Sequence, residues 1–489
     1  MITVSDTGAD NSLKQRSIKA LIWTGSELLM RQGLQFGVAI FLARLLSPEE
    51  FGTVALLSLF VGIGTVFIES GFSSALVQKH DITHADESTV FWFNLGMGAV
   101  VMVLLWLVAP FVANFYQRPV LTPLMGVMAL SVFISAVGGI QHTLLTKNLN
   151  FKAPMQASVA ASLLSSIVVC VLAYYGYGIW SLAWQTLTNC VVTSSLLWLL
   201  SRWRPSLTFS LPSLKKLFGF GSYLMLSSLM DVAYNRFYSL LIGKIYSVHD
   251  LGIYTRAENT KQIPVDLLSM LMYRVTFPLF SAAANDCDRL KRGMVIALRG
   301  IMFLNVPIML GLMVTADKLV PVLFGGQWTP AIPLLQVLCL AGVLWPLHVI
   351  NLSVLKALGH SHLFFRLEIL KKILGTLLII GGLYYGIIGL AWSQVVFGVL
   401  AFWINAFYTR KFLKYGAWGQ MFDFLPVTII SIIMAVAVFY AGQVINLPTI
   451  GLLSAQIGLG IFIYWGLCSV FKVAAYQDIM NILIKRKVV

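Results

Sequence analysis

Long apolar stretches, one after another along the chain, constrain this sequence more than any other feature. A helix that crosses a bilayer needs roughly 20 mostly apolar residues, because its backbone must form its own hydrogen bonds there. Hydrophobic residues make up 58% of the 489 positions and charged residues only 11%, against roughly 25% charged in an ordinary soluble domain. Fourteen candidate stretches lie at about 18–45, 51–70, 89–114, 119–145, 153–175, 178–200, 217–246, 252–280, 293–315, 330–355, 363–384, 387–408, 424–443 and 449–471. We therefore predict an all-α polytopic membrane protein with about 14 transmembrane helices.

The first residues and the cysteines narrow the class of membrane protein. The segment MITVSDTGADNSLKQRS is longer and more acidic than the basic region of a cleavable signal, and the first apolar stretch lacks a small-residue cleavage site. We expect the first helix to remain as a signal anchor. The five cysteines form no CxxC pair and no cluster with histidine, so neither a disulfide framework nor a metal site is predicted.

A net charge of +15 raises the question of nucleic acid, and the placement of the charges answers it. With a cytoplasmic N-terminus, most Lys and Arg residues fall in cytoplasmic loops and in the C-terminal segment, as the positive-inside rule requires. An even number of spans then places both termini in the cytoplasm. Topology and anionic lipid explain the basic charge, so we predict no nucleic-acid partner.

Three pairs of similar segments, which we call echoes, indicate that the chain contains a duplicated unit. YGIWSLAW at 177–184 matches YGIIGLAW at 385–392 in six of eight positions. The second echo aligns ARLLSPEEFGTVA at 43–55 with GKIYSVHDLGIYT at 243–255. The third aligns TPLMGVMAL at 122–130 with IPLLQVLCL at 332–340. The echoes keep one order along the chain, so we infer that a unit of six helices was duplicated.

Because six is an even number, both copies enter the membrane from the same side and form two parallel lobes. We predict an N-terminal six-helix lobe at 1–210, a C-terminal six-helix lobe at 211–415, and two appended transmembrane helices with a cytoplasmic tail at 416–489. Two such lobes suit alternating access, in which they rock about a central cavity that opens to each face in turn.

Ionisable residues within the predicted spans mark the candidate site. Each costs roughly 2.5 to 3.5 kcal/mol on insertion scales, so such residues normally face a cavity or a partner. Glu27 and Arg31 lie four residues apart on one face of the first helix and can pair. The second lobe adds Asp231, Arg236, Lys261, Asp266, Arg274 and Arg299. Five cations against three carboxylates leave an excess of positive charge, which favours an anionic substrate.

We predict that these cations bind substrate and that the carboxylates exchange a coupling ion. The substrate-binding candidates are Arg31, Arg236, Lys261, Arg274 and Arg299, because a planar guanidinium suits phosphate. The ion-coupling candidates are Glu27, Asp231 and Asp266, which would exchange a proton or sodium. The alternative for each residue is a structural ion pair or a snorkelling side chain, above all for Arg274 and Arg299. Lys371 and Lys372 either line the inner mouth or snorkel, with snorkelling the favoured interpretation.

Signatures of enzymes are scarce in this sequence. No GxxxxGK[ST] motif occurs, so ATP-driven pumping by this chain is not supported. The predicted outer loops are short and leave no room for an extracytoplasmic catalytic domain. We therefore predict no enzymatic activity and no cofactor.

Five stretches resemble a known transporter family. They are ARLLSPEEFG (43–52), ESGFSSALVQK (69–79), FPLFSAAANDCDRLKRGM (277–294), LFGGQWTPAIPLLQVLCLAG (323–342) and YGIIGLAWSQ (385–394). In this order they resemble the Wzx-type lipopolysaccharide and exopolysaccharide flippases of the MOP superfamily, particularly the colanic-acid-exporter-like branch. The resemblance covers nearly the whole chain and implies a MATE/MOP-like fold of twelve core helices in two lobes.

The resemblance also supplies a substrate class. It implies a transporter of the bacterial inner membrane that carries an undecaprenyl-diphosphate-linked oligosaccharide repeat unit from the cytoplasmic to the periplasmic leaflet for polysaccharide biosynthesis. The implied partners are that lipid-linked glycan, membrane lipids and polysaccharide polymerase or assembly proteins. By position, Arg31, Arg236 and Arg274 best match the functional arginines of the superfamily.

Three other functions stay open from the sequence. A MATE-like exporter of drugs or small molecules shares the two lobes, although it should have a net acidic cavity. A membrane-bound glycan polymerase or ligase is disfavoured by the short outer loops. A scaffold of the polysaccharide assembly complex, with no transport of its own, fits the same sequence features.

Overall fold

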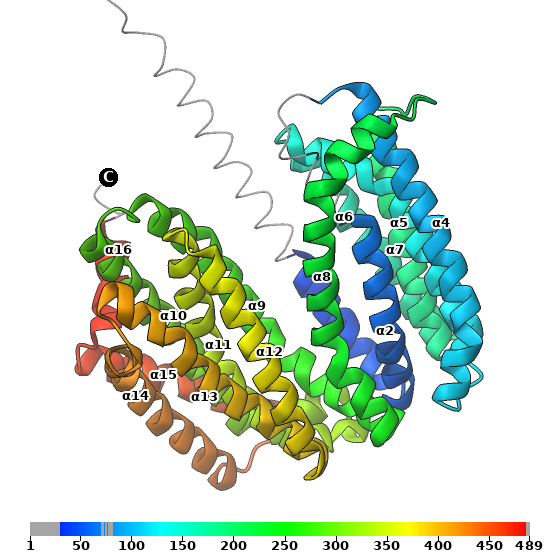
Figure 1. Ribbon diagram of the computed structural model, residues 1–489. Coiled ribbons are helices and arrows are strands. Elements are labelled where there is room, and N and C mark those ends of the chain that lie inside the picture. The colour runs from blue at the N-terminus through cyan, green and yellow to red at the C-terminus, as the bar shows by residue number, and fades with distance from the viewer. Residues whose placement is uncertain (1–29, 70–72, 74–75, 77–81, 486–489) are drawn as a thin grey trace, which may run out of the picture. The chain divides into compact units, whose positions relative to one another are not determined.

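The computed structural model describes residues 30–69, 73, 76 and 82–485, and this part of the chain is helical throughout, with no strand (Figure 1). Residues 30–45 form the described part of the first helix. The helices that follow are α2 (Pro48–Glu69), α4 (His84–Phe115), α5 (Leu121–Lys147), α6 (Lys152–Tyr174), α7 (Ile179–Leu200), α8 (Leu211–Ile245), α9 (Val248–Ala282), α10 (Cys287–Phe324), the 3-10 turn η1 (Gly326–Trp328), α11 (Ala331–Ala357), α12 (Ser361–Leu383), α13 (Gly386–Leu413), α14 (Ala417–Val444), α15 (Thr449–Val470) and α16 (Ala474–Lys485).

Each predicted span after the first coincides with one long helix, which confirms the all-α polytopic fold. Nine of the described helices are long and apolar enough to cross a membrane: α2, α4, α5, α6, α10, α11, α13, α14 and α15. Helices α7, α8, α9 and α12 do not combine high enough hydropathy with few enough charged residues, and the first helix is described only from residue 30. Charged residues interrupt α8, α9 and α12, whereas α7 contains none and is instead rich in amides and hydroxyls. The total of about 14 crossings therefore remains a prediction.

The echo around residues 47 and 247 corresponds to two equivalent helix starts. The backbone N–H of Glu50 donates to Ser47 Oγ over 3.4 Å, and that of Asp250 donates to Ser247 Oγ over 3.0 Å. In each copy the carboxylate three residues later accepts a hydrogen bond from the same serine. This reciprocal cap satisfies backbone donors that the first turn of a helix leaves unpaired. The repeated sequence thus encodes the first turns of α2 and α9.

The two equivalent helix starts also lie against each other within the first half of the chain. A Cβ atom added to Gly52 would lie 1.8 Å from the carbonyl oxygen of Val248, and one added to Gly252 would lie 1.8 Å from that of Pro48. The contact is symmetric, since residue 52 meets 248, the repeat equivalent of 48, and residue 48 meets 252, the repeat equivalent of 52. Glycine at both positions allows this approach of two backbones, as small residues do at other helix crossings in membranes.

The YGI..LAW echo encodes a tight turn followed by a helix. Gly178 and Gly386 have positive φ values of 54° and 75°, and α7 and α13 begin at Ile179 and Gly386. A residue without Cβ adopts this backbone region with little strain.

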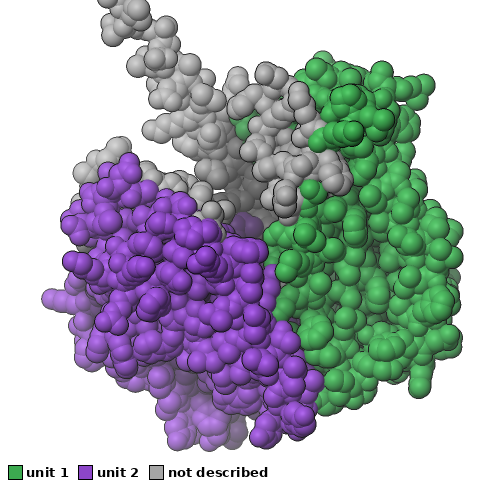
Figure 2. Space-filling model, viewed as in Figure 1, with its two compact units in different colours: residues 1–252 green, residues 253–489 purple. Residues whose placement is uncertain are grey.

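The chain divides into two compact units, residues 1–252 (unit 1) and residues 253–489 (unit 2), coloured separately in Figure 2. Unit 1 takes in α8, which packs on α2. In unit 2, α14 packs along α10, and α15 contacts both of these helices. The hydroxyl of Tyr464 on α15 donates to the carbonyl of Phe303 on α10 over 2.6 Å. The boundary between the units follows packing and lies later than the repeat boundary; the predicted lobes 1–210, 211–415 and 416–489 remain a prediction about the repeat.

Candidate functional site

Three of the predicted site residues with described side chains belong to unit 1. Arg31 lies at the start of the described part of the first helix, where its Nε is buried and has no hydrogen-bond partner among the described residues. Asp231 and Arg236 lie on α8, and both are exposed in the absence of lipid. Glu27, the predicted partner of Arg31, lies outside the described residues. A buried guanidinium nitrogen without a partner is costly in an apolar medium, so Arg31 is a strong candidate for binding an anion.

Unit 2 contains the other predicted residues, beginning with α9. Lys261 is only 5% exposed, and its Nζ lies 2.8 Å from Oε1 of Glu258, one helical turn earlier. Asp266 is exposed and accepts a hydrogen bond of 2.7 Å from the amide of Gln262. The side chain of Arg274 lies outside the described part of the chain.

Arg299 forms an ion pair that joins two helices of unit 2. Its Nε donates to Oδ1 of Asp423 on α14 over 3.0 Å, and the hydroxyl of Tyr415 donates to Oδ2 of the same carboxylate over 2.5 Å. Burial, followed by the hydrogen bond to Asp423, raises the pKa of the Tyr415 hydroxyl. This geometry fits a structural ion pair, which was the alternative interpretation of Arg299. A role of Arg299 in substrate binding remains a prediction.

Two Glu-x-x-Lys ion pairs were not predicted from the sequence. Glu258 with Lys261 on α9 and Glu368 with Lys371 on α12 share this spacing, and in each pair the lysine is nearly buried and the glutamate more accessible. Lys371 is therefore paired instead of extending freely to water. A buried cation with a carboxylate one turn away is partly compensated, so the excess of positive charge is smaller than the sequence count. The spacing itself was visible in the sequence and could have identified both pairs.

Arg256 is a second buried cation of α9 that was not among the predicted site residues. It is buried, with its guanidinium carbon 4.9 Å from the ring centre of Phe324 and 4.7 Å from that of Trp328. Guanidinium over aromatic faces is a stabilising arrangement. Phe324 ends α10 and Trp328 ends η1, and the contact of these two rings with Arg256 is a tertiary feature that no local pattern predicts.

A polar pocket of about 220 Å³ lies within unit 1. It is lined by amide, hydroxyl and thiol side chains from the first helix, α6 and α7, namely Gln35, Ser162, Ser165, Ser166, Gln185, Thr186, Asn189 and Cys190. No charged residue is among these lining residues. None of these lining residues was predicted as a site residue, although the low hydropathy of the uncharged helix α7 was a signal for them.

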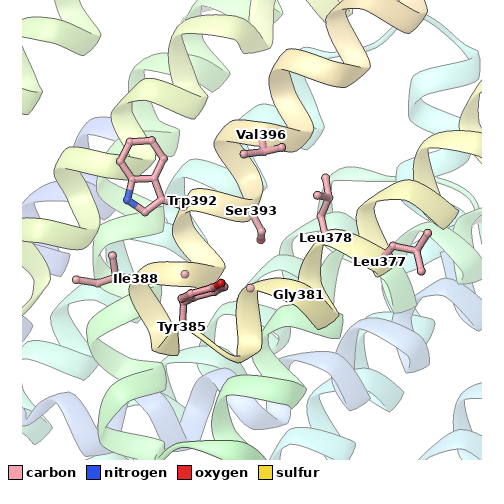
Figure 3. Close-up of a pocket in the computed structure, with 10 residues that line it drawn as sticks. Leu377, Leu378, Gly381, Tyr385, Ile388, Trp392, Ser393 and Val396 are labelled. Atoms are coloured by element: carbon pink, nitrogen blue, oxygen red, sulfur yellow. The ribbon is translucent and has the colours of Figure 1, made fainter.

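An apolar groove of about 470 Å³ lies in unit 2 between the end of α12 and the start of α13 (Figure 3). Gly382 and Gly389 bring the two helices together, since a Cβ on Gly389 would lie 2.4 Å from the carbonyl oxygen of Gly382. Tyr385 and Trp392 of the repeated motif line the groove. Its surface is almost wholly hydrocarbon, which suits lipid chains and excludes a charged group.

Comparison with known proteins identifies the family. The family model described as "Polysaccharide biosynthesis protein" matches residues 41–333. The chain is 26% identical over 449 residues to the lipopolysaccharide biosynthesis protein WzxC of Escherichia coli (strain K12), covering 88% of this chain and 90% of that protein. It is 30% identical over 358 residues to the succinoglycan biosynthesis transport protein ExoT of Rhizobium meliloti (strain 1021), covering 73% of this chain and 71% of that protein.

Solved structures support the same assignment at the level of fold. A structure of the lipid II flippase MurJ in an inward closed conformation matches with a TM-score of 0.76 and 15% identity, covering 94% of this chain and all of that one. An inward-facing MATE multidrug resistance transporter of the MOP superfamily matches with a TM-score of 0.59 and 17% identity, covering 79% and 96%. The resemblance to Wzx-type proteins of polysaccharide biosynthesis drawn from the sequence is confirmed by the family model and by WzxC, and the solved structures show a MATE/MOP-like fold. The chain is a multi-pass membrane protein that belongs to the family of polysaccharide biosynthesis proteins.

Proposed function

We propose that this chain is an alternating-access flippase that moves an undecaprenyl-diphosphate-linked oligosaccharide from the cytoplasmic to the periplasmic leaflet of the inner membrane, with both of its own termini in the cytoplasm. The observation that carries the proposal is the family match over residues 41–333, a range that includes α9 with its buried cations Arg256 and Lys261. Relatives named for lipopolysaccharide biosynthesis and succinoglycan transport support the substrate class.

The side chains suggest how the headgroup is held. Arg31 offers a buried guanidinium Nε without a described partner, and Arg236 offers an exposed guanidinium on α8. These groups replace part of the water around the diphosphate, because an unpaired charge in low dielectric is prohibitively costly. In unit 2, Lys261 can bind a phosphate only by leaving Glu258, so the carboxylate competes with the phosphate for the ammonium group. The polyprenyl chain stays in the lipid.

The membrane potential favours this direction of transport. With a cytoplasm-negative potential, outward movement of negative charge gains roughly 2.3 kcal/mol per charge for each 100 mV. Cations that move with the protein reduce that gain. A proton or sodium ion exchanged at Glu27, Asp231 or Asp266 resets the empty carrier. The protein acts as a transporter and makes or breaks no covalent bond in its substrate.

A leaflet-exchange assay tests the proposal. Purified protein is placed in proteoliposomes with a fluorescent undecaprenyl-diphosphate oligosaccharide, and a quencher that acts only from outside reports exchange. We expect exchange by wild type, its loss in Arg31→Ala, and its retention in Arg289→Ala, which removes an exposed arginine from the first turn of α10. Absence of exchange in wild type under both a proton gradient and a sodium gradient would refute the proposal, and an active Arg31→Ala would remove Arg31 from the site.

A further inference from the structure

The polar pocket of unit 1 is built from matched faces of two helices. Ser162 and Ser166 lie four residues apart on α6, and Gln185 and Asn189 lie four residues apart on α7. Residues at this spacing share one helix face. The two faces meet, since Nδ2 of Asn189 donates to Oγ of Ser165 over 3.3 Å. The pocket therefore lies at the middle of both helices, at the depth of the bilayer interior.

Several polar groups in this pocket have no partner in the described part of the protein. Ser162 and Ser166 are only 3% and 6% exposed, and their hydroxyls form no hydrogen bond to another described residue. The carboxamides of Gln35, which is exposed, and of Gln185, which is half-buried, also line the pocket and form no hydrogen bond to another described residue. Burying an amide or hydroxyl without a hydrogen bond costs roughly 2–7 kcal/mol. The pocket thus requires water or a polar ligand.

The chemistry of the lining selects a neutral ligand rich in hydroxyl groups. Carboxamides and hydroxyls both donate and accept hydrogen bonds, whereas a phosphate would be better served by arginine or lysine, which the lining lacks. The volume of about 220 Å³ is several times the roughly 30 Å³ that one water molecule occupies in the liquid. That is room for one sugar ring and too little for an oligosaccharide.

The first helix connects this pocket to the proposed phosphate site. Arg31 and Gln35 lie four residues apart in the same helix, so their side chains share a face with about 5–6 Å between Cβ atoms. A diphosphate held by Arg31 therefore brings the sugar attached to it close to Gln35. We propose that the pocket binds the first, neutral sugar ring of the lipid-linked glycan, an inference that rests on the proposed function and adds a glycan subsite to it.

Binding measurements in lipid nanodiscs test this subsite. The probes are undecaprenyl diphosphate and the same lipid bearing a single glucose or a single galactose. We expect wild type to bind a sugar-bearing lipid about tenfold more tightly, the effect of one or two net hydrogen bonds. Gln185→Leu and Asn189→Leu should lose this preference while keeping their affinity for the bare lipid. The control Ser195→Leu, at an exposed position of α7 outside the pocket, should keep it.

The native cysteines provide a second readout that needs no substitution. Cys190 lines the pocket, whereas Cys170 on α6 is similarly half-buried but does not. With a small thiol reagent and mass spectrometry of each cysteine, the sugar-bearing lipid should protect Cys190 and leave Cys170 unchanged. Equal affinity of wild type for the bare and sugar-bearing lipids, or protection of Cys190 by neither sugar, would overturn the subsite and leave the flippase proposal intact. Binding of neither type of lipid would instead overturn the flippase proposal itself.

Discussion

The reciprocal contact between Gly52 and Gly252 gives a sharp prediction about stability. In Gly52→Ala the new methyl group would lie 1.8 Å from the carbonyl oxygen of Val248, where ordinary contacts begin at 3.4 Å. The obstructing atom belongs to a helix backbone and cannot rotate away, so the two helices must separate. Overpacking of this kind typically costs about 1–3 kcal/mol, and alanine recovers up to about 1 kcal/mol of helix propensity. We expect a net loss of about 1–2 kcal/mol.

Thermal unfolding of the purified protein in detergent or nanodiscs measures this loss. The matched control is Gly96→Ala, an exposed helical glycine of α4 whose added Cβ would meet no atom within 4 Å. It should be neutral or stabilising by up to about 1 kcal/mol, because alanine restricts the unfolded chain more than glycine. An unchanged or higher Tm for Gly52→Ala, or an equal loss in Gly96→Ala, would contradict the close backbone packing.

The double variant Gly52→Ala/Gly252→Ala tests whether the two glycines serve one crossing. Separation of the helices to admit the first methyl group also makes room for the second. The loss in the double variant should therefore be smaller than the sum of the two single losses, as expected for residues in direct contact. Additive losses would indicate that each glycine acts at an independent site.

Three further perturbations address other parts of the fold. Glu258→Gln should lower Tm, because it leaves the nearly buried Lys261 uncompensated. Breaking a fully buried pair costs about 3–5 kcal/mol, and the loss should be smaller here because the Glu258 carboxylate is 29% exposed. Adding Lys261→Met should recover much of the lost stability, and no recovery would argue against the pair. Gly386→Ala should destabilise the folded protein by about 1 kcal/mol through the positive φ alone, since no atom lies within 4 Å of the added Cβ. Gly386→Asn should lose less stability in the same thermal assay, because asparagine tolerates positive φ better than alanine. The raised pKa of Tyr415 keeps its hydroxyl protonated in the folded protein above pH 10.0, whereas in the unfolded chain this hydroxyl ionises near its ordinary pKa of 10.0. The stabilising effect of the Tyr415 hydroxyl is therefore complete below pH 10.0 and is lost as the pH rises toward the folded pKa. Tyr415→Phe should flatten the fall of Tm above about pH 10 relative to wild type, and an identical fall in both proteins would refute this.

Much of the helical organisation could be predicted from local patterns. Apolar length placed each long helix, because the bilayer demands that length whatever the neighbours are. The echo at Ser47 and Ser247 marked two real helix starts, because a cap is formed by residues three apart in sequence. The glycine of YGI..LAW marked a turn for the same local reason. The match to the polysaccharide biosynthesis family agrees with the motifs read in order along the chain.

The candidate site was less accessible to such reasoning. Counting charges identified Lys261 as a buried cation but left out Glu258, since only net excess was considered and not the spacing between neighbours. Arg299 was counted with the substrate-binding set, while its carboxylate partner lies on a helix more than a hundred residues away in sequence, at Asp423. The polar pocket was missed because its amides and hydroxyls come from three helices and carry no charge.

The sequence by itself determined that this chain is a helical membrane protein, because hydropathy, capping and turn residues act over one helix or one turn. Only the tertiary structure decided which buried charges are already compensated, where two backbones touch at Gly52 and Gly252, and which uncharged side chains gather around one cavity. These features depend on which helix faces meet. Because a bilayer solvates every apolar face equally well, side-chain fit and hydrogen bonding between helices determine that choice.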